Sequence, residues 1–229
     1  MAKDMSDWSR FERLTPFRIR DVLLVASPFD FYLLEESGYL AEIMRQEYAE
    51  LNLSQSPRII HSREARDALQ LIRERQFDLV ITMARVGSMD VNAFGREVKS
   101  IVTDMPVILL SHNTRELATL HAGDGIDRIF VWTGDSRILL SICKLIEDEK
   151  NVAYDVSDAD VQVILLVEDS RRFYSAYLPL LYTQLVKQTT RLMGEGGNLE
   201  EKLLRLRARA KILLATDMQS ARSIIDRYH

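Results

Sequence analysis

Residues 77–91 read Phe-Asp-Leu-Val-Ile-Thr-Met-Ala-Arg-Val-Gly-Ser-Met-Asp-Val. The stretch opens with a short apolar run between a polar residue and a Gly-Ser pair, which is the pattern of a strand buried on both faces. A loop over residues 85–90 then leads into a segment with Phe94, Val98 and Ile101 on one helical face. A buried strand, a loop and an amphipathic helix form one unit of a doubly wound parallel sheet, which binds ligands at the carboxyl ends of its strands.

Four other apolar runs have the same character and alternate with segments of helical period. These further predicted strands cover residues 21–26, 57–61, 106–111 and 128–132. The predicted helices run to about residue 51, from about 62 to 72, and over 94–102, 114–121 and 135–150. Five strands alternating with five helices predict an α/β fold, a doubly wound (βα)5 arrangement in three layers. The expected strand order is 2-1-3-4-5, with right-handed crossovers.

The composition limits the possible function classes. The 229 residues carry a formal net charge of −4, so we expect no general nucleic-acid surface. No apolar run approaches the ~20 residues that cross a bilayer, and no membrane association is predicted. A single cysteine, Cys143, excludes an intramolecular disulfide and a Cys-based zinc site, which favours a cytoplasmic location. Cys143 lies on the apolar face of a predicted helix, so we expect a buried structural thiol.

The chain is expected to divide at a polar segment. Residues 151–160 are acid-rich and lack an apolar period, so they are interpreted as a linker. The unit before it covers residues 18–150 and follows an N-terminal arm of residues 1–17.

An internal repeat follows the predicted linker. Residues 165–167 and 173–174 match residues 23–25 and 31–32 at a constant offset. Residues 161–229 are therefore predicted to form a second, incomplete βαβα unit. A two-stranded sheet is marginal alone, so we expect that the chain belongs to a longer protein, or that this half docks on the first unit or on another copy.

The amino-acid sequence and residue spacing of residues 77–91 resemble the third strand and following loop of bacterial response-regulator receiver domains, which have a flavodoxin-like fold. The resemblance covers residues 19–150 as a whole domain and residues 161–229 as the first half of a second receiver-like domain. An active receiver needs an acid pair after strand 1 for Mg²⁺, a phosphoacceptor aspartate after strand 3, a hydroxyl after strand 4 and a lysine after strand 5. The resemblance assigns these positions to Ala26, Ser27, Met83, Ser111 and Trp132. Only the hydroxyl is kept, and a thioether is neither a nucleophile for phosphorus nor a hard Mg²⁺ ligand. The resemblance therefore implies a pseudo-receiver that takes no phosphoryl group.

An acid pair follows the first strand of the predicted second unit. The receiver resemblance implies that Glu168 and Asp169 would be Mg²⁺ ligands in a complete second unit. Alternatively, they simply begin a helix, where the amino-terminal dipole favours carboxylates. No other cofactor is predicted.

Two further stretches are similar to a narrower group of proteins. Residues 126–135 and 163–170 resemble the amino-terminal region of bacterial phosphoenolpyruvate synthase-like or pyruvate phosphate dikinase-like proteins. In that group, tandem receiver-like modules precede a nucleotide- and pyruvate-binding region. Nothing in the present residues matches that later region, so the resemblance implies no kinase or synthase activity here.

Other polar segments allow two interpretations each. Residues 111–114 and 133–136 could bind an anion near helix starts, or could cap those helices. His112 is interpreted as a loop residue rather than a base. A basic cluster is expected on a solvated surface, with an acidic partner or nucleic acid as the alternative, and it consists of Arg205, Arg207, Arg209 and Lys211. Residues 173–186 are apolar around more than one helical face and predict burial on several sides or a self-association surface.

These observations favour a non-catalytic regulatory module for protein–protein interaction, either in bacterial two-component signalling or in control of a fused enzyme. One alternative is a phosphorelay receiver whose working site lies in the second unit. Another is a flavodoxin-like binder of small ligands that uses the loops after strands 4 and 5. The expected partner is a protein or a fused downstream domain, and a homodimer is possible through the helix at 173–186 or the face of helix 4, strand 5 and helix 5.

Overall fold

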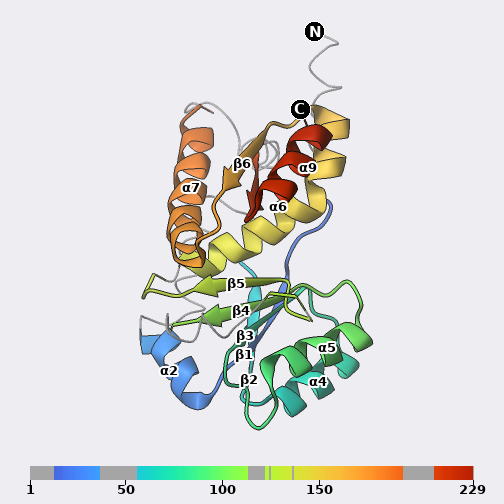
Figure 1. Ribbon diagram of the computed structural model, residues 1–229, viewed down its shortest axis with the longest axis vertical. Helices are drawn as coiled ribbons and strands as arrows, with labels where there is room; N and C mark the ends of the chain where they lie inside the picture. Colours follow the sequence, from blue (N-terminus) through green and yellow to red (C-terminus); the bar gives the residue numbers. More distant parts are fainter. Residues whose placement is uncertain are drawn as a thin grey trace. The chain divides into compact units, whose positions relative to one another are not determined.

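The computed structural model describes residues 13–36, 56–112, 122–123, 125–135, 137–192 and 209–228 (Figure 1). The chain divides into two compact units. The five-stranded unit comprises residues 19–46 and 55–138, and the two-stranded unit comprises residues 1–18, 47–54 and 139–229. The predicted helix over 114–121, the predicted helical residues beyond 36 and most of the predicted arm lie outside the described residues.

The five-stranded unit contains one parallel sheet with the order β2-β1-β3-β4-β5. Its strands are β1 (Asp21–Val25), β2 (Arg58–Ser62), β3 (Leu79–Met83), β4 (Val107–Ser111) and β5 (Arg128–Val131). The predicted strand order is confirmed, and it is the order of flavodoxin and receiver folds. Since β2 lies on one side of β1 and β3 on the other, sheet growth changes direction there, and such a switch point opens a crevice at the carboxyl ends of the strands.

Strands β3 and β4 are buried on both faces, as their continuous apolar runs predict. No side chain of either strand is more than 2% exposed. Helices α4 (Ala65–Glu74) and α5 (Val91–Ile101) lie together on one face of the sheet (Figure 1). There Phe94 and Val98 of α5 join Val80 and Leu109 of the strands in one core cluster. This packing fixes the ends of the strands, where the site described below is formed.

Helix α5 approaches the loop before β5 closely at two glycines. A Cβ atom on Gly95 would lie 2.6 Å from the carbonyl oxygen of Gly125. Gly125 itself has a φ of +104°, a backbone conformation that residues other than glycine rarely adopt. A Cβ there would also collide with the backbone nitrogen of Arg96. Both positions therefore require glycine.

The substitution Gly95→Ala is expected to lower the free energy of unfolding by about 1–3 kcal/mol, because backbone atoms must move to admit the methyl group. Urea denaturation followed by circular dichroism measures this change. Ser100→Ala at an exposed position of the same helix is the matched control and should change stability by less than about 0.5 kcal/mol. Equal stability of the two variants would contradict the close approach.

The two-stranded unit repeats the pairing of the first two strands. Strand β6 (Val163–Val167) pairs in parallel with β7 (Lys211–Ala215). Leu165 lies opposite Leu213, as Leu23 lies opposite Ile60 in the other sheet. Helix α7 (Arg171–Leu192) follows β6, and α9 (Met218–Tyr228) follows β7. The predicted βαβα order is therefore present, and the sequence repeat corresponds to a repeated strand register.

The predicted linker at 151–160 is wrong, because helix α6 runs without a break from Arg137 to Ala159. The boundary between the units lies between residues 138 and 139 instead. The polar residues Asn151 and Asp155 are completely buried on α6. The Asn151 amide donates to the carbonyl of Phe17 and accepts from its N–H, at 2.8 and 2.9 Å. Buried polar side chains thus interrupt the apolar period on this part of α6, so hydrophobic periodicity alone does not predict the helix here.

Cys143 of α6 is 1% exposed, which confirms the predicted buried thiol. Burial raises the pKa of this thiol to about 12, and the carboxylate of Glu147 acts in the same direction. The thiol is therefore protonated at neutral pH and unreactive. Among the described residues, no helix combines the length and the apolar character that crossing a membrane requires.

The Asp148 carboxylate on α6 has a complete set of partners in the two-stranded unit. Arg209 donates two hydrogen bonds to its two oxygens, at 2.8 and 2.9 Å. The Tyr182 hydroxyl and the Ile212 N–H donate to it at 3.0 and 2.9 Å. The N–H of Lys211 in β7 donates to the carbonyl of Gln162, on the side of β6. The N–H of the next residue, Ile212, therefore points to the opposite edge of β7. Asp148 thereby satisfies an edge group that would otherwise be buried unpaired.

A second buried ion pair joins the same strand and helix. The Lys211 ammonium lies 2.8 Å from an Asp155 oxygen and donates to the Thr15 hydroxyl at 3.0 Å. Arg209 and Lys211 are 7% and 1% exposed, so the predicted solvated surface is wrong for both residues. Burial lowers the pKa of Lys211 and nearby Arg209 lowers it further, against the opposing effect of the two carboxylates. Arg205 and Arg207 lie outside the described residues.

The Tyr182 hydroxyl gives this cluster a measurable pH dependence. Burial raises its pKa well above the ordinary value of 10.0, and Asp148 raises it further. Above pH 10 the unfolded chain releases the phenol proton while the folded chain retains it, so stability falls as pH rises. Tyr182→Phe should cost about 1.5–3 kcal/mol at pH 7 through the lost hydrogen bond to a charged group. The difference from the wild type should shrink above pH 10, measured by urea denaturation at several pH values.

A difference between wild type and Tyr182→Phe that stays constant up to pH 11 would contradict the buried phenol. The variant Tyr177→Phe provides the control, because Tyr177 is 42% exposed on the same helix. Its unfolding free energy should follow that of the wild type at every pH.

Candidate functional site

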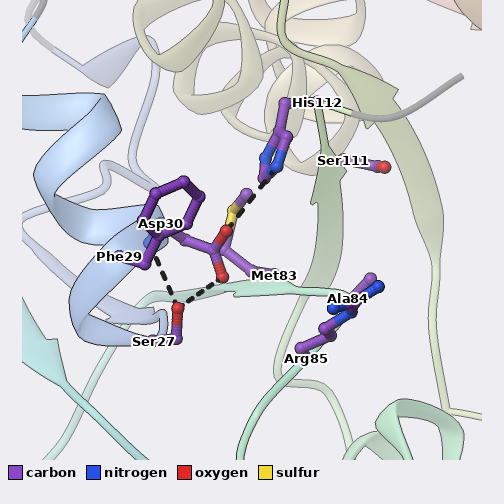
Figure 2. A pocket seen from close by; sticks show the side chains of 8 residues that line it. All are labelled: Ser27, Phe29, Asp30, Met83, Ala84, Arg85, Ser111 and His112. Carbon is purple, nitrogen blue, oxygen red and sulfur yellow. Dashed lines mark hydrogen bonds and ion pairs between the residues drawn. The ribbon is translucent and has the colours of Figure 1, made fainter.

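A cavity of about 290 Å³ lies at the carboxyl ends of β1, β3 and β4 in the five-stranded unit (Figure 2). This is the edge of the sheet at which doubly wound folds bind their ligands. The cavity is lined by Ser27, Phe29, Asp30, Met83, Ala84, Arg85, Ser111 and His112. We refer to it below as the switch-point pocket.

The first wall of the pocket is the start of helix α2 (Pro28–Glu36). Ser27 precedes this helix, and its hydroxyl accepts the N–H of Asp30 at 3.1 Å. The same hydroxyl donates to a carboxylate oxygen of Asp30 at 2.8 Å. Pro28 occupies the first helical position, where its fixed φ is favourable. A capping serine and an acid three residues later thus fix the first helical turn.

The first turn of α2 is also held against β2. The Phe31 ring stacks on the His61 ring with centroids 3.8 Å apart. The Nε2 atom of His61 lies 2.9 Å from the Ala26 carbonyl oxygen, which can only accept, so this nitrogen is the donor. His61 therefore contacts both the Ala26 carbonyl before α2 and the Phe31 ring in its first turn. These two contacts fix the position of Asp30, which lies between Ala26 and Phe31 in the chain.

Asp30 is the one carboxylate among the residues that line the pocket. It is 8% exposed, and its second oxygen lies 3.7 Å from Nε2 of His112. That distance is too long for a hydrogen bond, although a protonated His112 would form an ion pair there. Figure 2 shows the His112 ring directed toward this carboxylate. The Asp30 side chain therefore presents one carboxyl oxygen to the pocket and to the His112 ring.

The predicted receiver positions are brought together in part. Ser27, Met83 and Ser111 line the pocket. Ala26 is buried and is not a lining residue, and its carbonyl accepts a hydrogen bond from His61. Met83 and Ser111 are each 2% exposed. Trp132 is not among the lining residues. Its N–H donates to the carbonyl of Ser111 at 2.9 Å, and its side chain is half-buried.

Sequence reasoning missed Asp30 and interpreted His112 as a loop residue rather than a base. The signal for Asp30 is the Ser-x-x-Asp spacing that begins at Ser27, which indicates a helix start and so carries the acid back toward the strand end. No comparable signal exists for His112. Its position depends on where β4 ends relative to α2, which is a matter of tertiary packing.

The capping interpretation is confirmed for the loop after β5. Asp135 accepts the N–H of Arg137 at 3.0 Å and three hydrogen bonds from its guanidinium. Partial burial raises the pKa of Asp135, but the hydrogen bonds from Arg137 outweigh this and leave it below its usual value. Residues 113, 114 and 136 of the two predicted loops lie outside the described residues.

The acid pair after β6 is arranged as a helix start. The Glu168 carboxylate accepts the N–H of Ser170 at 2.9 Å, and the Ser170 carbonyl accepts the N–H of Phe173 and Tyr174. Asp169 is exposed. In the part of the chain that the structure describes, no three His, Cys, Asp or Glu side chains gather as metal ligands. Mg²⁺ binding at Glu168 and Asp169 stays a prediction.

Comparison with known proteins finds no matching family model and no matching curated protein. Several solved structures are similar. The signal receiver domain of an HD domain-containing protein from Pseudomonas fluorescens Pf-5 is 20% identical, with a TM-score of 0.44 over 61% of this chain and 94% of that chain. A response regulator receiver domain protein from Clostridium thermocellum is 18% identical, with a TM-score of 0.45 over 58% and 98%.

A third similar structure is the signal receiver domain of a signal transduction histidine kinase from Syntrophus aciditrophicus. It is 24% identical, with a TM-score of 0.39 over 57% of this chain and 91% of that chain. The fold of the five-stranded unit is shown by its own parallel strand order, β2-β1-β3-β4-β5.

Proposed function

We propose that the five-stranded unit is a non-catalytic, receiver-like regulatory module that acts through protein contacts and takes no phosphoryl group. The observation that carries this proposal is Met83. It occupies the carboxyl end of the middle strand, 2% exposed, and lines the switch-point pocket. A thioether at this point offers neither a nucleophilic oxygen nor a ligand for a hard cation.

The neighbouring residues support the same conclusion. Phosphoryl transfer to a carboxylate relies on Mg²⁺ and fixed cations to neutralise the phosphoryl oxygens. Ala26 and Ser27 carry no charge to hold the metal, and Trp132 provides no cation after β5. Asp30 is the lining carboxylate, but one of its oxygens already accepts a hydrogen bond from Ser27. A site with these side chains is suited to contacts and binding rather than to phosphoryl chemistry.

The partner is proposed to be a protein of a bacterial two-component pathway or a fused enzyme that resembles phosphoenolpyruvate synthase. The similarity of residues 126–135 and 163–170 to the modules of such proteins supports the second setting. Self-association is also proposed. Helix α7 supports it, because Phe173, Tyr177 and Leu180 are about half exposed while Tyr174 and Leu178 are buried.

The acid pair after β6, Glu168 and Asp169, supports an alternative proposal, in which the two-stranded unit belongs to a phosphorelay receiver. The hydrogen bond from Ser170 to Glu168 favours the helix-start interpretation over a metal ligand. Binding of a small ligand in the five-stranded unit is favoured by a specific observation, the cavity at its switch point. That alternative is compatible with a regulatory module whose input is a ligand rather than a phosphoryl group.

The proposal is tested by incubating the full chain with acetyl phosphate and Mg²⁺, and by measuring its intact mass. We expect no added phosphoryl group, because no lining residue combines a nucleophilic carboxylate with a metal site. An active receiver domain treated in parallel is the positive control. An added phosphoryl group on the five-stranded unit would overturn the proposal, and its loss in Asp30→Asn would identify the acceptor.

A further inference from the structure

We propose that the free edge of strand β6 is an interface between two copies of this chain, whose β6 strands pair antiparallel about a two-fold axis at Leu165. This inference rests on the self-association proposed above, and it deepens that proposal by naming the surface and the arrangement of the two copies. Pairing joins the two sheets into one sheet with the order β7-β6-β6-β7.

The first argument is the direction of the backbone groups of β6. The Gln162 carbonyl accepts the N–H of Lys211, and the Glu168 N–H donates to the Ala215 carbonyl, at 2.8 and 3.0 Å. Residues of even number in β6 therefore face β7, because successive residues of a strand direct their N–H and C=O groups to alternate sides. The residues that face the opposite edge are Val163, Leu165 and Val167. Among the described residues, β6 pairs with no strand other than β7.

The corresponding edge in the five-stranded unit is covered. Strand β1 corresponds to β6 in the internal repeat, and its second edge pairs with β3. Val22 and Val25 of β1 are 1% and 0% exposed, whereas their counterparts Ile164 and Val167 of β6 are 38% and 52% exposed. Strand β6 therefore has the apolar side chains of a covered strand, and within the described residues the covering strand is missing.

The exposed edge also lacks the features that keep edge strands apart. Residues 163–167 read Val-Ile-Leu-Leu-Val, with neither a charged side chain nor a proline. Soluble proteins use such residues to prevent an exposed edge from pairing with another chain. An edge without them is suited to pairing. A sheet of two strands is moreover marginal alone, whereas a sheet of four strands is of ordinary size.

The other edge of the same sheet favours an assembly of only two copies. The Ile212 N–H of β7 donates to the Asp148 carboxylate at 2.9 Å, so a side chain of α6 already occupies that edge. In the part of the sheet that the structure describes, the β6 edge is thus the one that can accept a strand. When the same edge of two copies meets about a two-fold axis, the contact closes as a dimer and does not continue into a filament.

The acid pair after β6 selects the antiparallel arrangement. In a parallel pair of β6 strands, Glu168 and Asp169 would lie beside the same two acids of the second copy, and like charges placed opposite one another are destabilising. In the antiparallel register about Leu165, Glu168 lies opposite Gln162 of the second copy. Asp169 lies opposite Val161 of that copy. Neither Gln162 nor Val161 is charged, so this register avoids the repulsion.

The test combines the mass of the full chain in solution with the exchange of its backbone N–H groups. Sedimentation equilibrium from micromolar to millimolar concentration should show a reversible dimer. Hydrogen exchange followed by two-dimensional NMR should slow at Leu165 and Val167 as the dimer forms. The N–H groups of Ile164 and Leu166 face β7 and are the internal control, because their exchange should be slow at every concentration.

Substitutions at the edge test the register. Val167→Lys places a charge in the apolar interface and should weaken dimerisation about tenfold or more. Met218→Lys, at a side chain on α9 that is 66% exposed, is the matched control and should leave the dimer unchanged. Position 163 lies opposite position 167 in the antiparallel register, so a mixture of Val163→Glu and Val167→Lys should form a heterodimer more stable than either homodimer. Slow exchange at Ile164 and Leu166 verifies that each variant is folded.

A chain that stays monomeric at millimolar concentration would overturn the inference. So would a dimer in which the exchange of Leu165 and Val167 is unchanged, or a mixture of the two edge variants that forms no heterodimer. A dimer weakened by Leu180→Lys on α7 but not by Val167→Lys would place the contact on α7 and would also overturn it. None of these results alters the outcome with acetyl phosphate, so failure of the interface and failure of the proposed function are distinguishable.

Discussion

The middle strand β3 is buried along its whole length, and the character of the pocket at its carboxyl end follows from that burial. A carboxylate at position 83 would need a metal ion or a fixed cation to offset its desolvation. The residues at the receiver positions that would supply such charges are Ala26, Ser27 and Trp132, and none carries a charge. The thioether of Met83 is therefore consistent with its surroundings, because the anion and the groups that would balance it are absent together.

Two buried carboxylates, Asp148 and Asp30, differ in how completely they are hydrogen-bonded. Asp148 receives four hydrogen bonds, two of them from Arg209, and joins helix α6 to the outer edge of β7. Asp30 receives a hydrogen bond from the Ser27 hydroxyl on one oxygen and leaves the other facing a cavity. Both are nearly inaccessible to solvent, yet only the second has acceptor capacity directed into a pocket. The number of hydrogen-bond partners, rather than burial itself, distinguishes the two side chains.

The five-stranded fold could be predicted because its strands are continuous apolar runs and its helices have apolar faces at regular spacing. Val80 and Leu109 needed no tertiary information to be assigned to a core. The continuation of α6 could not be predicted, since Asn151 and Asp155 are polar and become interior only through Phe17, Thr15 and Lys211. The pocket was predictable at Ser27, Met83 and Ser111, which follow strand ends. The charged groups of the pocket could not be predicted, because Asp30 lies near the strand ends only through the placement of helix α2 against the sheet.

The most direct test of a receiver fold without phosphoryl chemistry is a titration of the chain with Mg²⁺ and beryllofluoride, a mimic of the phosphoryl group. Two-dimensional NMR then follows the Met83 methyl group and the backbone signal of Ser111, which both lie at the pocket. We predict no saturable change in either signal, because no carboxylate at position 83 can hold the mimic and no acid pair can hold the metal. Saturable shifts at both residues would contradict the proposal and would mean that another side chain completes a working receiver site.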